Sequence, residues 1–150
     1  MSSNLLAPVN WLEIILRLGC ACFFGALIGW DRQAKDKPAG LRTHMLVSLG
    51  SALFTLIPIQ LTVAQADPNA FSRIVQGIIT GVGFLGAGEI FREPRSKSPR
   101  QYRIRGLTSA AAIWISASLG IIAGSGLWKI GLIAVLMTWL ILAGLKKIEP

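Results

Sequence analysis

The feature that most constrains this chain is a series of five apolar stretches, each long enough to cross a lipid bilayer. A transmembrane helix needs about 20 such residues, because the hydrocarbon core is ~30 Å thick and an α-helix rises ~1.5 Å per residue. The sequence therefore predicts an all-α, polytopic membrane helix bundle of about five transmembrane helices. The approximate spans are Leu12–Trp30, His44–Val63, Ile74–Phe91, Leu107–Gly124 and Leu127–Leu145.

The amino-acid composition agrees with a membrane protein and argues against two other classes. Hydrophobic residues make up 53% of the chain and charged residues only 15%, which leaves too little polar surface for a water-soluble globule. The net charge of +8 would suit nucleic acid on a solvated fold, but here the basic residues flank apolar spans. We therefore expect one transmembrane domain over residues 1–150, with the lipid bilayer and not nucleic acid as its partner.

The basic residues also predict the orientation of the chain. Twelve of them lie in residues 31–43, in residues 92–106 and in the C-terminal tail, whereas the opposite face holds only Arg73 and Lys129, and Arg17 lies within the first span. Cytoplasmic loops carry the excess of Lys and Arg in membrane proteins, so the N-terminus is expected outside and the C-terminus inside. No basic side chain precedes the first span, and we do not interpret that span as a secretory signal peptide, which begins with a charged segment.

Small residues recur at helical spacing and predict close helix packing. Such residues let backbones approach where lipid offers no hydrophobic drive for association. The first, third and fourth spans carry them, so these three helices are expected near the centre of the bundle. The glycines that we assign to packing are Gly25, Gly29, Gly77, Gly81, Gly86, Gly88 and Gly120.

The third span is the richest in glycine, with Gly81, Gly83, Gly86 and Gly88 close together. The first three formally spell the GxGxxG motif of dinucleotide sites, but that motif needs a strand, a turn and a helix in water. We reject that interpretation. Two others remain: a continuous helix with a glycine face, or a broken helix, which in transporters marks a binding site.

Charged residues inside the spans are costly in lipid and are therefore informative. Glu13 and Arg17 stand at i and i+4 in the first span, the spacing and order that favour an ion pair on one helix face. Glu89 lies about one turn from the inner end of the third span. We expect it to meet Arg92 or another basic residue, to line a cavity, or to be protonated.

Three runs of sequence lie in order along most of residues 25–120. The first joins GWDRQ at residues 29–33 to KPAGLRTHMLVSLG at residues 37–50; the second joins RIVQ at 73–76 to GVGFLGAG at 81–88; the third is RGLTSAA at 105–111. In this order they closely resemble the signatures of the MgtC/SapB family of bacterial membrane proteins. Family members usually have Glu at the position of Asp31 and an aliphatic residue at that of Glu89. Many also continue into a soluble ACT-like regulatory domain, and since this chain ends at Pro150, we expect a short form without it.

The signature residues fall at the predicted cytoplasmic ends of the spans. A bundle would gather them there into one polar cluster, beside Glu89: Asp31, Arg32, Arg42, Thr43, His44, Arg105 and Thr108. One interpretation is a clamp between helix ends, in which Asp31 pairs with Arg42 or Arg105. The other is a binding site for an anionic ligand, a lipid head group or a partner protein, to which His44 would add pH sensitivity.

Two classes of function remain. The resemblance implies a non-enzymatic regulatory protein of the bacterial inner (plasma) membrane, with a role in adaptation to low magnesium and in modulating other inner-membrane proteins. It also implies the alternative, a transporter of Mg²⁺ or another ion. A Mg²⁺ path needs oxygen ligands, preferably carboxylates, whereas the chain has seven acidic residues in all and a basic inner end. This favours the regulatory protein, and a homo-oligomer is left open.

The sequence offers no pattern that indicates catalysis or metal binding. It has no nucleophile, base and orienting group at recognisable spacing, no HExxH motif and only one histidine. We therefore expect no enzyme activity, no catalytic residue, no metal site and no cofactor.

Overall fold

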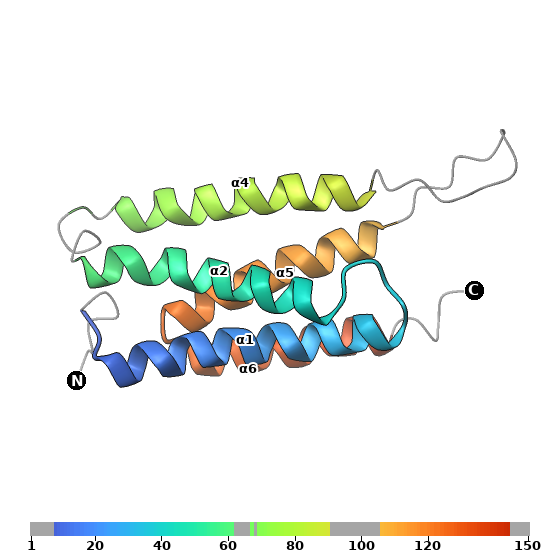
Figure 1. The fold of residues 1–150 in the computed structure, drawn as a ribbon, viewed down its shortest axis with the longest axis horizontal. Coiled ribbons are helices and arrows are strands. Elements are labelled where there is room, and N and C mark those ends of the chain that lie inside the picture. Colours follow the sequence, from blue (N-terminus) through green and yellow to red (C-terminus); the bar gives the residue numbers. More distant parts are fainter. Residues whose placement is uncertain (1–7, 62–66, 68, 91–105, 145–150) are drawn as a thin grey trace, which may run out of the picture.

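The chain folds into helices that run side by side, as the ribbon in Figure 1 shows. The computed structural model describes residues 8–61, 67, 69–90 and 106–144. Within these ranges there is no strand, and the prediction of an all-α fold is confirmed. The helices are α1 (Trp11–Ala34), α2 (Leu41–Gln60), α4 (Ala70–Ile90), α5 (Leu107–Gly124) and α6 (Trp128–Trp139), followed by the π-helical turn η1 (Leu140–Gly144).

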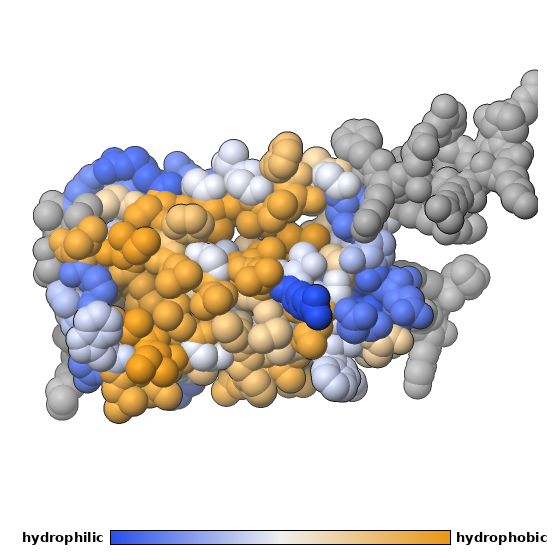
Figure 2. Space-filling view, viewed as in Figure 1, coloured by the Kyte–Doolittle hydropathy of each residue, from blue (hydrophilic) through white to orange (hydrophobic). Residues whose placement is uncertain are grey.

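The helices have the length and the surface of membrane spans. α1, α2, α4 and α5 are long and apolar enough to cross a bilayer, and α6 with η1 forms a shorter apolar helix. Figure 2 shows an apolar band across the middle of the bundle, with hydrophilic side chains gathered toward both ends. Lipid, rather than water, matches such a band. The chain is therefore a multi-pass membrane protein.

Successive helices alternate in direction, so the bundle has two distinct ends (Figure 1). The C-terminal ends of α1, α4 and α6 and the N-terminal ends of α2 and α5 meet at one of them. We call this the basic end, because Arg32, Lys35, Lys37 and Arg42 lie at or next to these termini. The alternation agrees with the charge pattern of the loops. That the basic end faces the cytoplasm remains a prediction.

Local sequence explains where two of the helices begin. The Asn10 side chain accepts a hydrogen bond from the backbone N–H of Glu13 at 2.8 Å and so caps α1. Gly106 precedes α5 at a φ of 95°, a conformation that favours glycine. A Cβ there would also lie 2.7 Å from the backbone oxygen of Glu89. Glycine at this position therefore lets the start of α5 abut the end of α4.

The centre of the bundle is formed by α2 and α5, which differs from the prediction. α5 contacts α1, α2, α4 and α6, and α2 contacts α1, α4 and α5. α4 lies at the edge, against α5 and α2 alone among the described helices. The expectation that the third span is central was wrong, and the central role of the second was missed. The physical reason is that α2 presents small hydroxyl and alanine side chains to its neighbours, among them Ser48, Ser51 and Ala52, which allow close approach as glycine does.

Glycines of α1 and α5 fit against the backbone of α2. A Cβ on Gly120 would lie 2.1 Å from the backbone oxygen of Ser48, and one on Gly25 would lie 2.6 Å from that of His44. A Cβ on Gly29 would lie 3.1 Å from His44 Cβ. All three distances are shorter than an ordinary van der Waals contact. Helices α1, α2 and α5 can therefore approach this closely only because these positions carry no side chain.

The glycines of α4 lie in more open surroundings. α4 is one continuous helix, so the broken third span that the glycine content left open is not found. In the described part of the chain, a Cβ at Gly77, Gly81 or Gly88 would meet nothing within 4 Å, and one at Gly86 would meet Ala110 Cβ at 3.5 Å. The GxxxG pair of α4 therefore does not pack against another of the described helices.

Candidate functional site

Arg32 is the centre of a buried polar cluster at the basic end. It lies in the last turn of α1 and is 4% exposed. One terminal guanidinium nitrogen donates a hydrogen bond to Ser109 Oγ of α5 at 2.5 Å, whereas Nε has no partner among the described residues. The charges of Asp31 and Glu89 both act on this guanidinium. Arg32 therefore links the end of α1 to α5 by a hydrogen bond and to α4 by charge.

His44 of α2 is fully buried next to Arg32. Its Nδ1 lies 2.8 Å from Ser116 Oγ on α5. The imidazole also interacts with the backbone carbonyl of Ala39, which precedes α2, and with the charge of Arg32. Its Nε2 has no well-formed hydrogen bond within the described ranges. His44 therefore joins α2 to α5 in the way that Arg32 joins α1 to α5.

A line of hydroxyl groups continues from His44 along α2. Ser48, Ser51 and Thr55 follow at helical spacing, and each is at most 4% exposed. Thr55 donates a hydrogen bond to the Ser51 backbone oxygen at 2.8 Å, and Ser48 Oγ has no partner in the part of the chain that the structure describes. Sequence reasoning missed this stripe of hydroxyl groups, although the period of 3.6 residues would have placed its members on one helix face.

Asp31 does not take the position predicted for it. Its carboxylate pairs with Lys35 one turn later on α1, with 2.6 Å between Oδ1 and Nζ. Arg42, one of the two predicted partners, is exposed, and the other, Arg105, lies outside the described residues. The reason is local, because an i,i+4 partner on the same helix is within reach without any rearrangement of the bundle. The expected clamp through Asp31 and Arg42 is therefore not formed, and Arg32 joins the helix ends instead.

The remaining predicted residues divide between the cluster and its surroundings. Glu89 is partly buried, its Oε1 has no hydrogen-bond partner among the described residues, and its charge acts on Arg32. Arg92, the partner expected first, lies outside the described ranges. Thr43 is partly buried and Thr108 is exposed. Within the described ranges, no three His, Cys, Asp or Glu side chains gather as metal ligands would.

A second buried arginine holds the opposite end of the bundle together. Arg17 of α1 is 4% exposed and pairs with Glu13, which confirms the i,i+4 prediction. It also donates a hydrogen bond to the backbone oxygen of Gly124, at 2.8 Å, in the last turn of α5, where helix carbonyls lack partners of their own. Gly126, at a φ of 74°, leaves room for the guanidinium, since a Cβ there would lie 3.0 Å from it. Arg17 therefore joins α1 to α5, as Arg32 does at the basic end.

Outside the spans, Asp67 offsets one basic residue at this opposite end. Its carboxylate accepts a hydrogen bond from the Asn69 backbone N–H at 2.8 Å and pairs with Arg73. These two interactions, the Asn69 hydrogen bond first, hold the pKa of Asp67 below its usual value. Arg73, one of the two basic residues predicted to face outside, thus has its counter-charge beside it.

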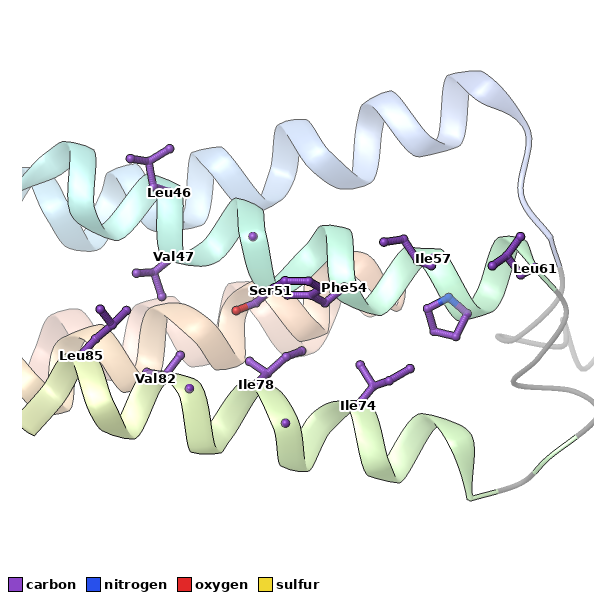
Figure 3. A pocket seen from close by; sticks show the side chains of 14 residues that line it. Leu46, Val47, Ser51, Phe54, Ile57, Leu61, Ile74, Ile78, Val82 and Leu85 are labelled. Carbon is purple, nitrogen blue, oxygen red and sulfur yellow. The ribbon is translucent and has the colours of Figure 1, made fainter.

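An apolar groove of about 800 Å³ opens between α2 and α4 (Figure 3). Side chains from both helices line it, including Phe54 and Leu46 on α2 and Ile74 and Leu85 on α4. Glycines of both helices border it as well. The groove follows from the position of α4, which packs mainly against α5 and only lightly against α2. Packing among the described helices thus leaves this groove open.

Comparison with known proteins assigns this bundle to a family. The sequence profile of the MgtC family matches residues 18–150. The chain belongs to the MgtC family. Protein SrpB of Synechococcus elongatus is 49% identical over 93% of this chain and 79% of SrpB. The putative magnesium transporter YhiD of Escherichia coli K12 is 41% identical over 87% of this chain and 59% of YhiD, and protein MgtC of Salmonella typhimurium is 41% identical over 82% of this chain and 48% of MgtC.

The MgtC family membership confirms the resemblance inferred from the three signature runs, all of which lie within the matched residues. No solved structure matches this chain. The chain spans less than two thirds of YhiD and of MgtC. What those whole proteins do is therefore a matter of proposal for this MgtC-family chain.

Proposed function

We propose that this MgtC-family protein is a non-enzymatic regulator in the bacterial inner membrane, which acts in adaptation to low magnesium by binding other membrane proteins. The family signatures imply the physiological role. The groove between α2 and α4 carries the proposal for the mode of action, because it is an apolar surface open to lipid along the membrane-spanning part of the bundle. Its occupant is a transmembrane helix of the partner protein.

The length of the groove favours a helix over a lipid chain. Along α2 it extends from Leu46 to Leu61, which is roughly 22 Å at ~1.5 Å per residue, against a hydrocarbon core of ~30 Å. The acyl chains of one leaflet reach only about half of that core. Helices approach most closely where small residues line the contact, and Gly77 and Gly81 border the groove. A helix in the groove would supply the packing that these glycines lack within the described chain.

The charges buried in the bundle favour regulation over Mg²⁺ transport. Arg32 is buried at the basic end, so a cation entering or leaving the interior there would meet a positive charge, whereas Arg17 at the opposite end is paired with Glu13. Mg²⁺ prefers carboxylate ligands together with several waters, whereas the seam between α2 and α5 carries hydroxyls and His44. The alternative, a transporter of Mg²⁺ or another ion, draws support from the name of the relative YhiD and from the partly buried carboxylate of Glu89.

A substitution that fills the groove tests the proposal in cells. Gly81→Leu places a side chain in the groove, whereas Gly83→Leu adds the same side chain about 200° around α4, where a Cβ also meets nothing within 4 Å in the described structure. The variants are expressed in a strain from which the gene for this protein has been deleted. We expect the Gly81 variant to reach the normal abundance in the membrane but to restore growth in low magnesium poorly. The Gly83 variant should restore it fully, and equal growth of the two would contradict the docking surface.

A flux measurement separates the proposal from the transporter alternative. The purified protein is reconstituted in liposomes that enclose a Mg²⁺-sensitive dye. We expect Mg²⁺ entry at the rate of protein-free liposomes. Saturable entry that is lost in Glu89→Gln would overturn the proposal in favour of a transporter.

A further inference from the structure

A second, smaller groove lies between α1 and α6. Its volume is about 470 Å³, within the roughly 300–1,000 Å³ typical of small-molecule sites. Leu27 of α1 and Leu132 and Leu136 of α6 line its length and are 38%, 57% and 54% exposed. The groove therefore opens to the lipid and is apolar along most of its extent.

Charged and aromatic side chains mark one end of this groove. Trp30 and Asp31 of α1 and Trp139 of α6 line it. The Asp31 carboxylate is bound to Lys35 Nζ, and the two side chains remain 15% and 26% exposed. The second carboxylate oxygen, Oδ2, is buried and has no hydrogen-bond partner within the described residues, so a further partner from the lipid would approach the carboxylate on its partly exposed side, at Oδ1. Because an ammonium has three donors and a carboxylate several acceptor sites, each member of this ion pair can take a further partner of opposite charge.

This end of the groove lies where a lipid head group would be. Trp30 and Trp139 are 71% and 50% exposed and lie toward the basic end, as tryptophans do at the membrane interface. The π-helical turn η1 follows Trp139 directly, and such turns are frequent at functional sites. A head group at the interface would meet the two indoles and the ion pair, while its acyl chain would enter the apolar part of the groove.

We propose that this groove binds one molecule of phosphatidylethanolamine. The primary ammonium of the lipid donates to the exposed side of the Asp31 carboxylate and lies against the tryptophan faces. Its phosphate accepts from Lys35, and one acyl chain lies along Leu27, Leu132 and Leu136. The charges of the lipid ammonium and phosphate then alternate in sign with those of Asp31 and Lys35, so the ion pair and the zwitterionic head group complement each other.

The chemistry of the head group distinguishes this lipid from two other common ones. Phosphatidylglycerol has no cation for Asp31 and would place its phosphate near that carboxylate. Phosphatidylcholine carries three methyl groups on its nitrogen and cannot donate a hydrogen bond to it. Lys37 and Arg42 attract anionic lipids to the basic end without such specificity. A preference for phosphatidylethanolamine over both lipids is therefore the signature of the site.

Tryptophan quenching by lipids with brominated acyl chains tests the proposal. Trp11, Trp114 and Trp128 are changed to Phe, so that emission comes from Trp30 and Trp139. The full-length protein is reconstituted in phosphatidylglycerol vesicles to which brominated phosphatidylethanolamine, phosphatidylcholine or phosphatidylglycerol is added in rising fractions. We expect the first to associate about threefold more strongly than the other two, as one interfacial charge pair allows.

Three variants on this background locate the site. Asp31→Asn should abolish the preference, and Asp36→Asn should keep it, since Asp36 lies in an exposed turn at a φ of 49° that Asn tolerates. Leu132→Phe fills the groove at a lipid-exposed position, so it should lower the association even where Asp31→Asn fails to fold. The proposal is overturned by equal association of all three lipids, by a preference for phosphatidylglycerol or phosphatidylcholine, by a preference that survives Asp31→Asn, or by an association of phosphatidylethanolamine that Leu132→Phe leaves unchanged.

Discussion

Gly120→Ala adds one methyl group at the closest glycine contact between helices. That methyl carbon would lie 2.1 Å from the Ser48 backbone oxygen and 2.8 Å from Ser51 Cβ, whereas ordinary contacts begin at 3.4 Å. The obstacle is mainly helix backbone, which cannot rotate away as a side chain does, so α5 must move away from α2. Overpacking of this kind costs ~1–3 kcal/mol. We expect the upper end, a loss of about 3 kcal/mol in the free energy of unfolding, because α2 and α5 form the centre of the bundle.

Gly81→Ala provides the matched control, since it adds the same methyl group at a helix glycine that borders the open groove. No described atom lies within 4 Å of that position, so the free energy of unfolding should stay within ~0.5 kcal/mol of the parent. Both variants are purified in mild detergent and unfolded by titration with dodecyl sulfate. Far-ultraviolet circular dichroism follows the loss of structure, and extrapolation to zero denaturant gives the free energies that are compared.

Two outcomes would refute the reasoning. Parental stability of Gly120→Ala would mean that α2 and α5 do not approach as closely as the structure has them. A loss in Gly81→Ala as large as that in Gly120→Ala would mean that α4 packs inside the bundle, as the small-residue pattern of the sequence predicts.

Two further predictions concern the buried cluster and the orientation. Ser116→Ala leaves His44 Nδ1 without its partner and should lower the free energy of unfolding by ~1–3 kcal/mol. The control Ser118→Ala loses a hydrogen bond within α5 and should change the free energy of unfolding by less than ~0.5 kcal/mol. Equal free energies for the two variants in the same titration would refute the role of the His44 contact. Alkaline phosphatase fused after Asn69 or after Ser125 should be active and fused at the C-terminus inactive, because basic loops stay in the cytoplasm, and activity at the C-terminus would reverse the orientation.

The membrane spans could be predicted from the sequence because a segment in contact with lipid must consist mainly of apolar residues. Apolar runs mark the segments that contact lipid, and the predicted fourth span coincides with α5 (Leu107–Gly124). The predicted second span begins at His44, whereas α2 begins at Leu41. Hydropathy misses this first turn because its residues are partly polar, although their backbone is helical. The hydropathy of a segment reports where lipid is, and the end of a helix depends on local hydrogen bonds.

The candidate site was harder to predict, because it depends on which face of each helix meets which neighbour. The GxxxG motif of α4 does not tell whether its glycines face another helix of the chain or an open groove. Only the packing of α4 distinguishes these two arrangements. The charge of Asp31 was correctly placed at the end of α1, but its partner was sought on other helices and lies on its own. The partners of Arg32 and His44 are serines, which hydropathy treats as ordinary small residues of an apolar span.

His44 and the line of hydroxyl groups that follows it on α2 have a consequence for the biogenesis of the protein. His44 and Ser116 are separated by 72 positions in the sequence, so at ~5–20 residues per second the ribosome adds Ser116 roughly 4–14 s after His44. During that interval His44 and the hydroxyls behind it lack the helix that will bury them, and polar groups facing lipid are costly. Helix α2 should therefore wait beside the translocation machinery until α5 emerges. A nascent chain that terminates before Leu107 would leave these polar side chains exposed permanently, and we expect membrane-bound proteases to degrade it.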